Sequence, residues 1–155
     1  RIDIVVGAND DPSQKVKEGM EKVKGSEDYL YVNVGGGLRK VEATINVMRN
    51  IPHCVPRVRV LGLGVNNLSE FPMSVLLFVN LEYLDLYDNQ LTTLPSEILK
   101  LEKLKVIWLH NNRLPSLPIE VGGLKQLKEL WVYGELCVGV WRSEGDVDLC
   151  FSESS

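Results

Sequence analysis

Apolar residues in the second half of the chain recur with a period of 23 residues. Three consecutive segments from Val58 to Gln126 read VRVLGLGVNNLSEFPMSVLLFVN, LEYLDLYDNQLTTLPSEILKLEK and LKVIWLHNNRLPSLPIEVGGLKQ. They share the pattern LxxLxLxxNxLxxLP, with an aliphatic residue three places after the Pro, and Leu127 begins a fourth copy. A repeat at this spacing predicts a stack of similar coils rather than one compact core.

Each part of the repeat has a structural role. Alternating apolar residues, such as Leu84 and Leu86, predict a short strand with one face inward and the intervening side chains outward. The Asn at the ninth position is expected to turn the chain and to bond backbone groups of neighbouring coils, because a buried amide needs partners. The Pro at the fifteenth position then starts the return segment. These residues are Asn66, Asn89 and Asn112, and Pro72, Pro95 and Pro118.

Residues 1–57 do not follow this period but repeat at 28 residues. The inward strand residues of the two copies are Ile4, Val6, Val32 and Val34. Asn9 is expected at the turn of the first coil and Gly37 at that of the second. The return segments 13–24 and 38–50 carry apolar residues at the spacing of an amphipathic helix, so a helix is expected in each.

The 23-residue pattern resembles the leucine-rich repeat family, in the form typical of intracellular Ras-group and scribble-like scaffold proteins. The two 28-residue copies resemble, in degenerate form, the ribonuclease-inhibitor subclass of the same family. The resemblance implies an α/β fold: a right-handed leucine-rich-repeat solenoid with a parallel concave sheet and convex helices or turns. The expected strand positions are Ile4, Val32, Leu61, Leu84, Ile107 and Leu130.

We expect about six coils in residues 1–135, with the longer irregular repeats in 1–57 and the 23-residue repeats in 58–135. Residues 136–155 leave the repeat and are expected to form a C-terminal cap or tail. Alternating runs on either side of a Gly-containing turn predict a small hairpin there, which would cap the last coil. No comparable cap precedes Ile2, which suggests that the natural chain extends further at that end.

In a leucine-rich repeat the concave sheet is the usual binding face, and the register identifies its outward residues. Equal positions in successive coils are neighbours, because adjacent parallel strands lie about 4.8 Å apart. The predicted partner-binding residues form two columns and one bordering position: Asp85, Trp108 and Trp131; Tyr87, His110 and Tyr133; and Tyr83. If exposed, the five large aromatic side chains approach about 800 to 1,000 Å², comparable to one side of a standard interface.

Two alternatives remain open for this face. The aromatic columns could be covered by the tail around Trp141 and Phe151, or by a second copy of the chain. In the first half of the face, glycines such as Gly35, Gly62 and Gly64 either let a partner approach the bare strands or merely tolerate tight curvature. His110 is most simply a polar contact rather than a base or a ligand.

Composition and charge exclude other classes. The chain has 155 residues, with 17 Lys+Arg against 21 Asp+Glu and a net charge of −4, so it lacks the basic clusters that bind nucleic acid. Its longest uncharged apolar run, Met73–Val79, is far shorter than the roughly 20 residues of a membrane span. Three widely spaced cysteines and the absence of a signal peptide predict reduced thiols and a cytoplasmic protein.

The sequence contains no recognisable catalytic arrangement. Tyr31–Gly37 precedes a helical pattern, which is the order of a phosphate-binding loop, but neither GK[ST] nor GxGxxG is present. His53 and His110 have no nucleophile motif near them, and the adjacency of His53 and Cys54 points their side chains apart. No catalytic residue, cofactor or metal site is therefore expected.

Together these features predict a non-catalytic protein–protein interaction module that presents an aromatic concave surface to a partner protein or peptide, in signalling or scaffolding. The alternative is a ligand- or peptide-sensing regulatory module of a larger protein, similar to those of immune receptors. An extracellular receptor fragment is a further alternative, because Asn67–Ser69 is a glycosylation sequon.

Overall fold

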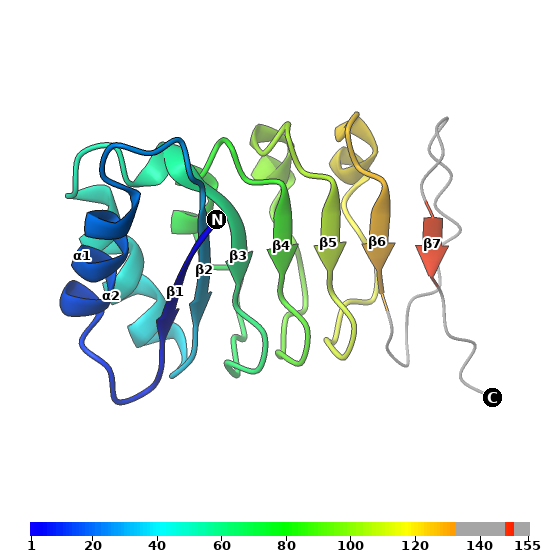
Figure 1. The fold of residues 1–155 in the computed structure, drawn as a ribbon. Helices are drawn as coiled ribbons and strands as arrows, with labels where there is room; N and C mark the ends of the chain where they lie inside the picture. Colours follow the sequence, from blue (N-terminus) through cyan, green and yellow to red (C-terminus); the bar gives the residue numbers. More distant parts are fainter. Residues whose placement is uncertain (133–147, 151–155) are drawn as a thin grey trace.

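The protein folds into one row of parallel strands that follows the order of the chain (Figure 1). The computed structural model describes residues 1–132 and 148–150. The strands are β1 (Ile2–Val6), β2 (Leu30–Val34), β3 (Val58–Gly62), β4 (Tyr83–Asp85), β5 (Val106–Trp108), β6 (Glu129–Trp131) and β7 (Asp148–Cys150). Each strand pairs in parallel with the next. Parallel neighbours need a crossover between them, and this succession of crossovers makes a solenoid.

The strand register agrees with the apolar repeat of the sequence. One ladder of paired residues runs through Ile4, Val32, Leu61, Leu84, Ile107 and Leu130. These are the six predicted strand positions, which the structure confirms. The first two steps of the ladder span 28 and 29 residues and the next three span 23. The inward positions nevertheless stay in register, because a slip of one residue would turn a strand's apolar face to solvent.

Two α-helices form the convex side of the first two coils, α1 (Pro12–Val23) and α2 (Leu38–Arg49). At the start of α1 the Asp11 carboxylate accepts a hydrogen bond from the Ser13 backbone N–H at 2.9 Å, and Pro12 suits the first turn. The residues that the helices bury are Val16, Gly19 and Val23 in α1, and Val41, Thr44, Ile45 and Met48 in α2. Both predicted amphipathic helices are confirmed.

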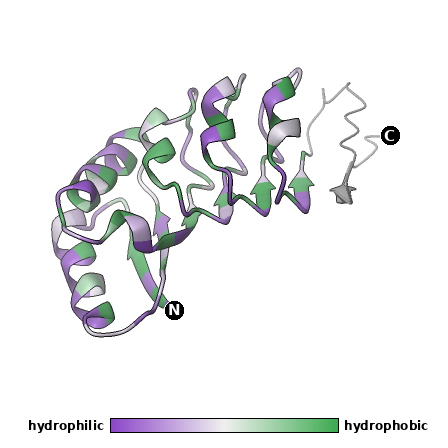
Figure 2. Cartoon of the chain, turned by 90° about the horizontal axis from the view of Figure 1, so that it is seen from above, coloured by the Kyte–Doolittle hydropathy of each residue, from purple (hydrophilic) through white to green (hydrophobic). Residues whose placement is uncertain are grey.

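Short 3₁₀ segments replace the helices in the 23-residue coils. They are η2 (Met73–Leu77), η3 (Ser96–Lys100) and η4 (Ile119–Gly123), and each begins directly after the predicted Pro. A return segment of five residues, against 12 in α1 and α2, accounts for the shorter coil. Figure 2 shows the helices and the 3₁₀ segments along the outer side of the row of strands.

Buried asparagines connect successive coils at the turn that follows each strand. Asn89 is only 6% exposed. Its Nδ2 donates to the carbonyl oxygens of Leu63 and Leu86, both at 3.0 Å, and its Oδ1 accepts two backbone N–H groups of the preceding coil at 3.0 Å. Asn66, also buried, and the half-buried Asn112 donate to two carbonyl oxygens in the same way and each accept one backbone N–H of the preceding coil. The predicted role of the ninth position is therefore confirmed in these coils.

The first two coils close the same turn in other ways. The Gly37 N–H donates to Asn66 Oδ1 at 2.9 Å, so the turn of the second coil is held by the third. In the first coil Asn9 is exposed, and Asp10 closes the turn by accepting the Gly7 N–H at 2.8 Å. Asn9 lies at this turn, as predicted, but the side-chain hydrogen bond that closes the turn comes from Asp10.

One continuous core runs through the described coils. It is built from the inward residues of the strands and from the apolar residues of the return segments, including the fully buried Phe78, Leu61 and Leu84. The predicted cap or tail at 136–155, with its hairpin, lies outside the described residues apart from β7, which pairs in parallel with β6.

Candidate functional site

The outward residues of the strands line up in two ladders across the concave side. The first runs through Asp3, Tyr31, Val60, Tyr83, Val106 and Glu129, and the second through Val5, Asn33, Gly62, Asp85, Trp108 and Trp131. The structure therefore brings together Asp85, Trp108 and Trp131, in the predicted order, with Tyr83 in the neighbouring ladder.

Exposure along these ladders is uneven. Tyr83 and Trp108 expose 42% and 39% of their surface, whereas Tyr87 and Trp131 are half-buried. Tyr133 lies outside the described residues. Among these aromatic residues, Tyr83 and Trp108 are therefore the two that the structure shows as exposed. The area of about 800 to 1,000 Å² includes Tyr133 and stays a prediction.

Tyr87 and His110, which follow β4 and β5 at equivalent positions, form a stacked pair. Their ring centroids lie 5.0 Å apart with an interplanar angle of 12°, within the range of favourable aromatic contacts. The Tyr87 ring also lies over Gly64, where a Cβ atom would collide with it. The pair is therefore held in place by a close approach that only glycine permits.

Two polar contacts join the acidic residues at the edge of the face to side chains of a neighbouring coil. Trp108 Nε1 donates to Glu129 Oε1 at 3.2 Å, and Asn111 Nδ2 donates to Asp88 Oδ1 at 2.6 Å. Both link neighbouring coils, so they limit the rotation of these side chains on the sheet.

Asp85 is a half-buried carboxylate at the centre of the face. Its Oδ1 accepts the Tyr87 backbone N–H at 3.0 Å. Burial raises the pKa of the Asp85 carboxyl above its ordinary value, while the Tyr87 N–H and the nearby His110 act in the opposite direction. Within residues 1–132 and 148–150, no Lys or Arg forms an ion pair with Asp85.

A hollow of about 280 Å³ opens on the concave side between β2 and β5. Its walls include Arg1, Tyr29 and Tyr31 on one side and Tyr83, Asp85 and Trp108 on the other, with Val60 and Gly62 between them. The hollow exists because the third coil places two small residues between larger side chains of the second and fourth coils.

Sequence reasoning placed most of these side chains on the concave face but missed Arg1 and Tyr29. Tyr29 has the same alternation phase as Tyr31 and Asn33, so extending that phase by two residues would have found it. Arg1 carries no such signal. The sequence also did not reveal that Val106, 9% exposed, is almost covered on this face.

At Gly36, Gly62 and Gly64 the glycine-rich half of the face is not bare backbone, which favours the second of the two interpretations of the sequence at these positions. A Cβ on Gly62 would lie 3.1 Å from Asn33 Oδ1, and one on Gly36 would lie 2.8 Å from the Cα of Ala8. Neighbouring residues of the chain itself already occupy the space beside these glycines. They serve close packing between coils rather than the approach of a partner to naked strands.

The glycine-rich turn at residues 35–37 is closed by its neighbours. The Gly37 N–H is bonded to Asn66 Oδ1, and the Lys40 ammonium group donates to the carbonyl oxygen of Asp10 at 2.7 Å. A phosphate at this turn would have to displace these contacts, so the geometry does not favour nucleotide binding.

The Cys54 thiol is not activated as a nucleophile. Burial raises the pKa of the Cys54 thiol to about 11, which keeps it protonated at neutral pH, unlike an activated nucleophile. Among the described residues, no group of His, Cys, Asp and Glu side chains is arranged to hold a metal ion. Over the same part of the chain, no helix has the length and apolar character needed to cross a bilayer.

Comparisons with known proteins agree with this architecture. Residues 79–121 match the family model described as Leucine Rich repeats (2 copies). A solved leucine-rich repeat protein of Leptospira interrogans is 28% identical, with a TM-score of 0.51, and the match covers 75% of this chain and 27% of that one. The chain thus corresponds to about a quarter of that protein's length. No curated protein sequence matches the chain. The parallel sheet, the register and both matches show the α/β solenoid fold of leucine-rich repeat proteins.

Proposed function

We propose that this chain is a non-catalytic module that docks a partner protein on the concave face of β4 to β6, as part of a cytoplasmic signalling or scaffolding assembly. Leucine-rich repeat domains generally mediate protein–protein interaction. The observation that carries the proposal is the exposure of two large aromatic side chains, Tyr83 and Trp108, on adjacent strands of this face.

The face has the composition and rigidity of a docking site. Aromatic residues lie at its centre and acidic residues at its edge, as in many binding hot spots. The parallel strands fix the backbone, and the bond from Trp108 to Glu129 and the stacking of Tyr87 on His110 restrict the side chains. Docking would therefore cost little conformational entropy.

The coils also differ in a way that supports an assignment of repeat class. We assign the 23-residue coils to the Ras-group and scribble-like class, because their return segments are 3₁₀ turns. The first two coils, with α-helices on the convex side, are assigned to the ribonuclease-inhibitor-like class.

The test is a double substitution, Tyr83→Ala with Trp108→Ala, in the full chain. Both side chains are exposed, so we expect the melting temperature to change little, whereas affinity for captured partner proteins should fall by roughly 30-fold or more. Trp131 is a poorer choice for this purpose, because it is half-buried and its truncation would disturb packing as well as docking.

Ile119→Ala is the matched control, because Ile119 is 81% exposed on η4, at the convex side. It removes exposed apolar surface away from the face and should leave capture unchanged. Equal capture by the double variant and the wild-type chain, in a quantitative pull-down, would show that the docking face lies elsewhere.

A further inference from the structure

We infer that the concave hollow receives a cationic side chain of the partner, an arginine or a lysine, between Tyr83 and Trp108 with Asp85 as its counter-ion. The inference rests on the proposed function, since it specifies the chemistry of a partner that docks on the same face. Three observations carry it: the size of the hollow, the balance of charges around it, and the way the chain already seats a guanidinium there.

The size of the hollow suits one side chain. Its volume of about 280 Å³ is at the lower end of the range for small-molecule sites. Val60 and Gly62 form its centre, and Gly62 pairs with Asp85 across β3 and β4. Gly62 contributes no side chain at that ladder position, and Asp85 itself lines the hollow.

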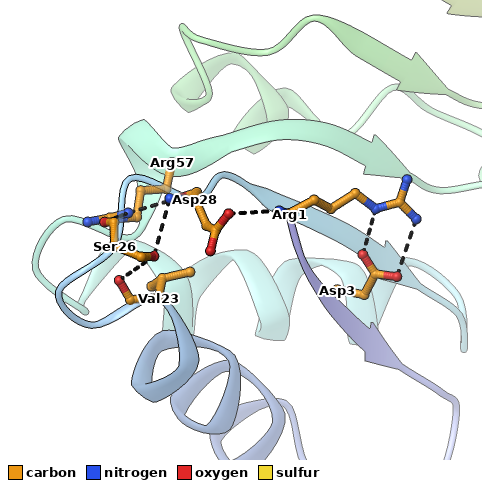
Figure 3. Close-up of polar contacts among 6 residues, drawn as sticks. All are labelled: Arg1, Asp3, Val23, Ser26, Asp28 and Arg57. Carbon is orange, nitrogen blue, oxygen red and sulfur yellow. Dashed lines mark hydrogen bonds and ion pairs between the residues drawn. The ribbon is translucent and has the colours of Figure 1, made fainter.

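Among the described residues, the charged groups around the hollow leave one carboxylate, Asp85, without a Lys or Arg partner. The guanidinium of Arg1 donates to Asp3 at 2.8 and 3.3 Å, and the amino group of the same residue contacts Asp28 at 2.8 Å (Figure 3). Lys105 pairs in the same way with Glu82 at 3.0 Å. Among the described residues that line the hollow, Asp85 is the one carboxylate, and it forms no ion pair with a Lys or an Arg. The basic group that acts on it is His110, whose ring is stacked on Tyr87 and is not part of the lining. A ligand cation that enters the hollow would therefore meet the Asp85 carboxylate.

The chain itself shows that the aromatic walls accept a guanidinium. The Cζ atom of Arg1 lies 4.3 Å from the centroid of the Tyr31 ring, a cation–π contact on one wall. Across the described residues, no cation occupies the rings of Tyr83 and Trp108 on the opposite wall. Trp108 is bonded through its ring nitrogen Nε1, lines the hollow and exposes 39% of its surface.

Other occupants fit less well. An anionic group would face Asp85, while the Arg1 guanidinium, which also lines the hollow, is already paired with Asp3. A purely apolar side chain would desolvate the Asp85 carboxylate further without compensating its charge, which is costly. A cation with an alkyl stem satisfies both parts of the site, since its stem contacts the rings and its head approaches the carboxylate.

Random 12-residue peptides displayed on phage provide the probe. They are selected on the immobilised full chain, with the Tyr83→Ala/Trp108→Ala variant as the counter-selection. The selected peptides are then synthesised with their natural residues, and also with citrulline in place of arginine or acetyl-lysine in place of lysine. Each is titrated by Trp fluorescence against the wild-type chain, Asp85→Asn and Asp88→Asn.

We expect the selected peptides to share a basic residue. Neutralising it, or introducing Asp85→Asn, should weaken binding at least about tenfold, as for the loss of a charge-assisted contact. Asp88→Asn removes the same charge from an exposed position on the same face and should weaken binding less than about threefold. Melting curves establish that each variant is folded.

The outcomes separate the two proposals. If no peptide prefers the wild-type chain to the double variant, the docking face itself is wrong and this inference falls with it. Peptides that prefer the wild-type chain but lack a basic residue, or bind Asp85→Asn equally well, overturn the inference and leave the docking face in place. Equal losses for Asp85→Asn and Asp88→Asn would also overturn it, because general charge attraction would then explain the preference.

Discussion

The two regions of the solenoid, residues 1–57 and residues 58–132, reach the same sheet by different convex structures. The first uses α-helices of 12 residues and the second uses 3₁₀ segments of five. Their inward positions still form one unbroken ladder. The comparison teaches that apolar alternation sets the strand register, whereas the return path can vary in length without disturbing it.

The concave side changes one coil later, between β3 and β4. Small and polar residues such as Val5, Asn33 and Gly62 precede the large aromatic residues of β4 to β6. The hollow lies where the two meet, since its walls come from β2 on one side and from β4 and β5 on the other. The hollow thus forms because neighbouring coils carry side chains of different size on this face, and the repeat pattern alone would not produce it.

The largest expected effect is a difference in unfolding free energy between two substitutions, one at the turn of a 23-residue coil and one at the turn of the first coil. Asn89→Ala removes a buried amide that joins two coils and leaves backbone groups without partners, so we expect a loss of about 3 kcal/mol in the free energy of unfolding. Asn9→Ala, at the exposed turn of the first coil, should change it by less than about 0.5 kcal/mol. Urea denaturation measures both, and similar losses would show that the first coil uses its Asn in the same way.

An intermediate effect concerns packing between helix and strand in the first region. Gly→Ala in a helix is normally stabilising, but a Cβ on Gly19 would collide with the buried Ile4 side chain. We therefore expect Gly19→Ala to reduce the free energy of unfolding by about 1 to 3 kcal/mol. Gly62→Ala is the matched substitution in the second region.

The new Cβ at position 62 would meet the exposed Asn33 side chain. Because that side chain can move, we expect a smaller loss in the free energy of unfolding than for Gly19→Ala. The reverse order would contradict the packing described for α1.

The smallest expected effect is the dependence of stability on pH through Asp85. Because burial raises its pKa, the folded state binds this proton more tightly than the unfolded state. Stability therefore declines as pH rises from the ordinary value of 3.8 through the raised value, and the loss persists above that interval. His110 and Asp88 are the other charged groups that act on this carboxyl.

The melting temperature of Asp85→Asn should accordingly be slightly higher than that of the wild-type chain at pH 7. The difference between the two melting temperatures should become smaller at acid pH, where Asp85 is protonated. Asp88→Asn gives the reference for removing a charge from an exposed position. A lower melting temperature for Asp85→Asn at pH 7 would mean that the chain already compensates this carboxylate, and it would remove the argument for an external cation.

The sequence predicted the fold in considerable detail because the repeat specifies which residues face inward. The strand positions, both helices and the roles of Asn66, Asn89 and Asn112 followed from spacing alone. Asn9 lies at the turn of the first coil, as expected. The spacing did not show that Asp10 would close this turn, because both side chains can accept a backbone N–H. The columns of Asp85, Trp108 and Trp131 were placed correctly.

Exposure and shape on the concave side were harder to predict. They depend on how side chains from neighbouring coils lean across one another, as Tyr87 leans over Gly64. The hollow depends in addition on the difference in side-chain size between neighbouring coils. The repeat pattern describes only what the coils share, so it does not show this difference. Whether the tail around Trp141 and Phe151 covers the face concerns residues outside the described ranges, and that alternative stays a prediction.

The asparagine contacts have a consequence for how this surface can change in size. Asn89 bonds only within its own coil and to the coil before it, so every 23-residue unit depends on its immediate neighbours alone. A genetic duplication of one such unit would insert a strand without altering the others and would lengthen the concave surface by one strand spacing, about 4.8 Å. The aromatic surface can thus be extended in fixed increments, while the hollow stays anchored at the junction of the two kinds of coil.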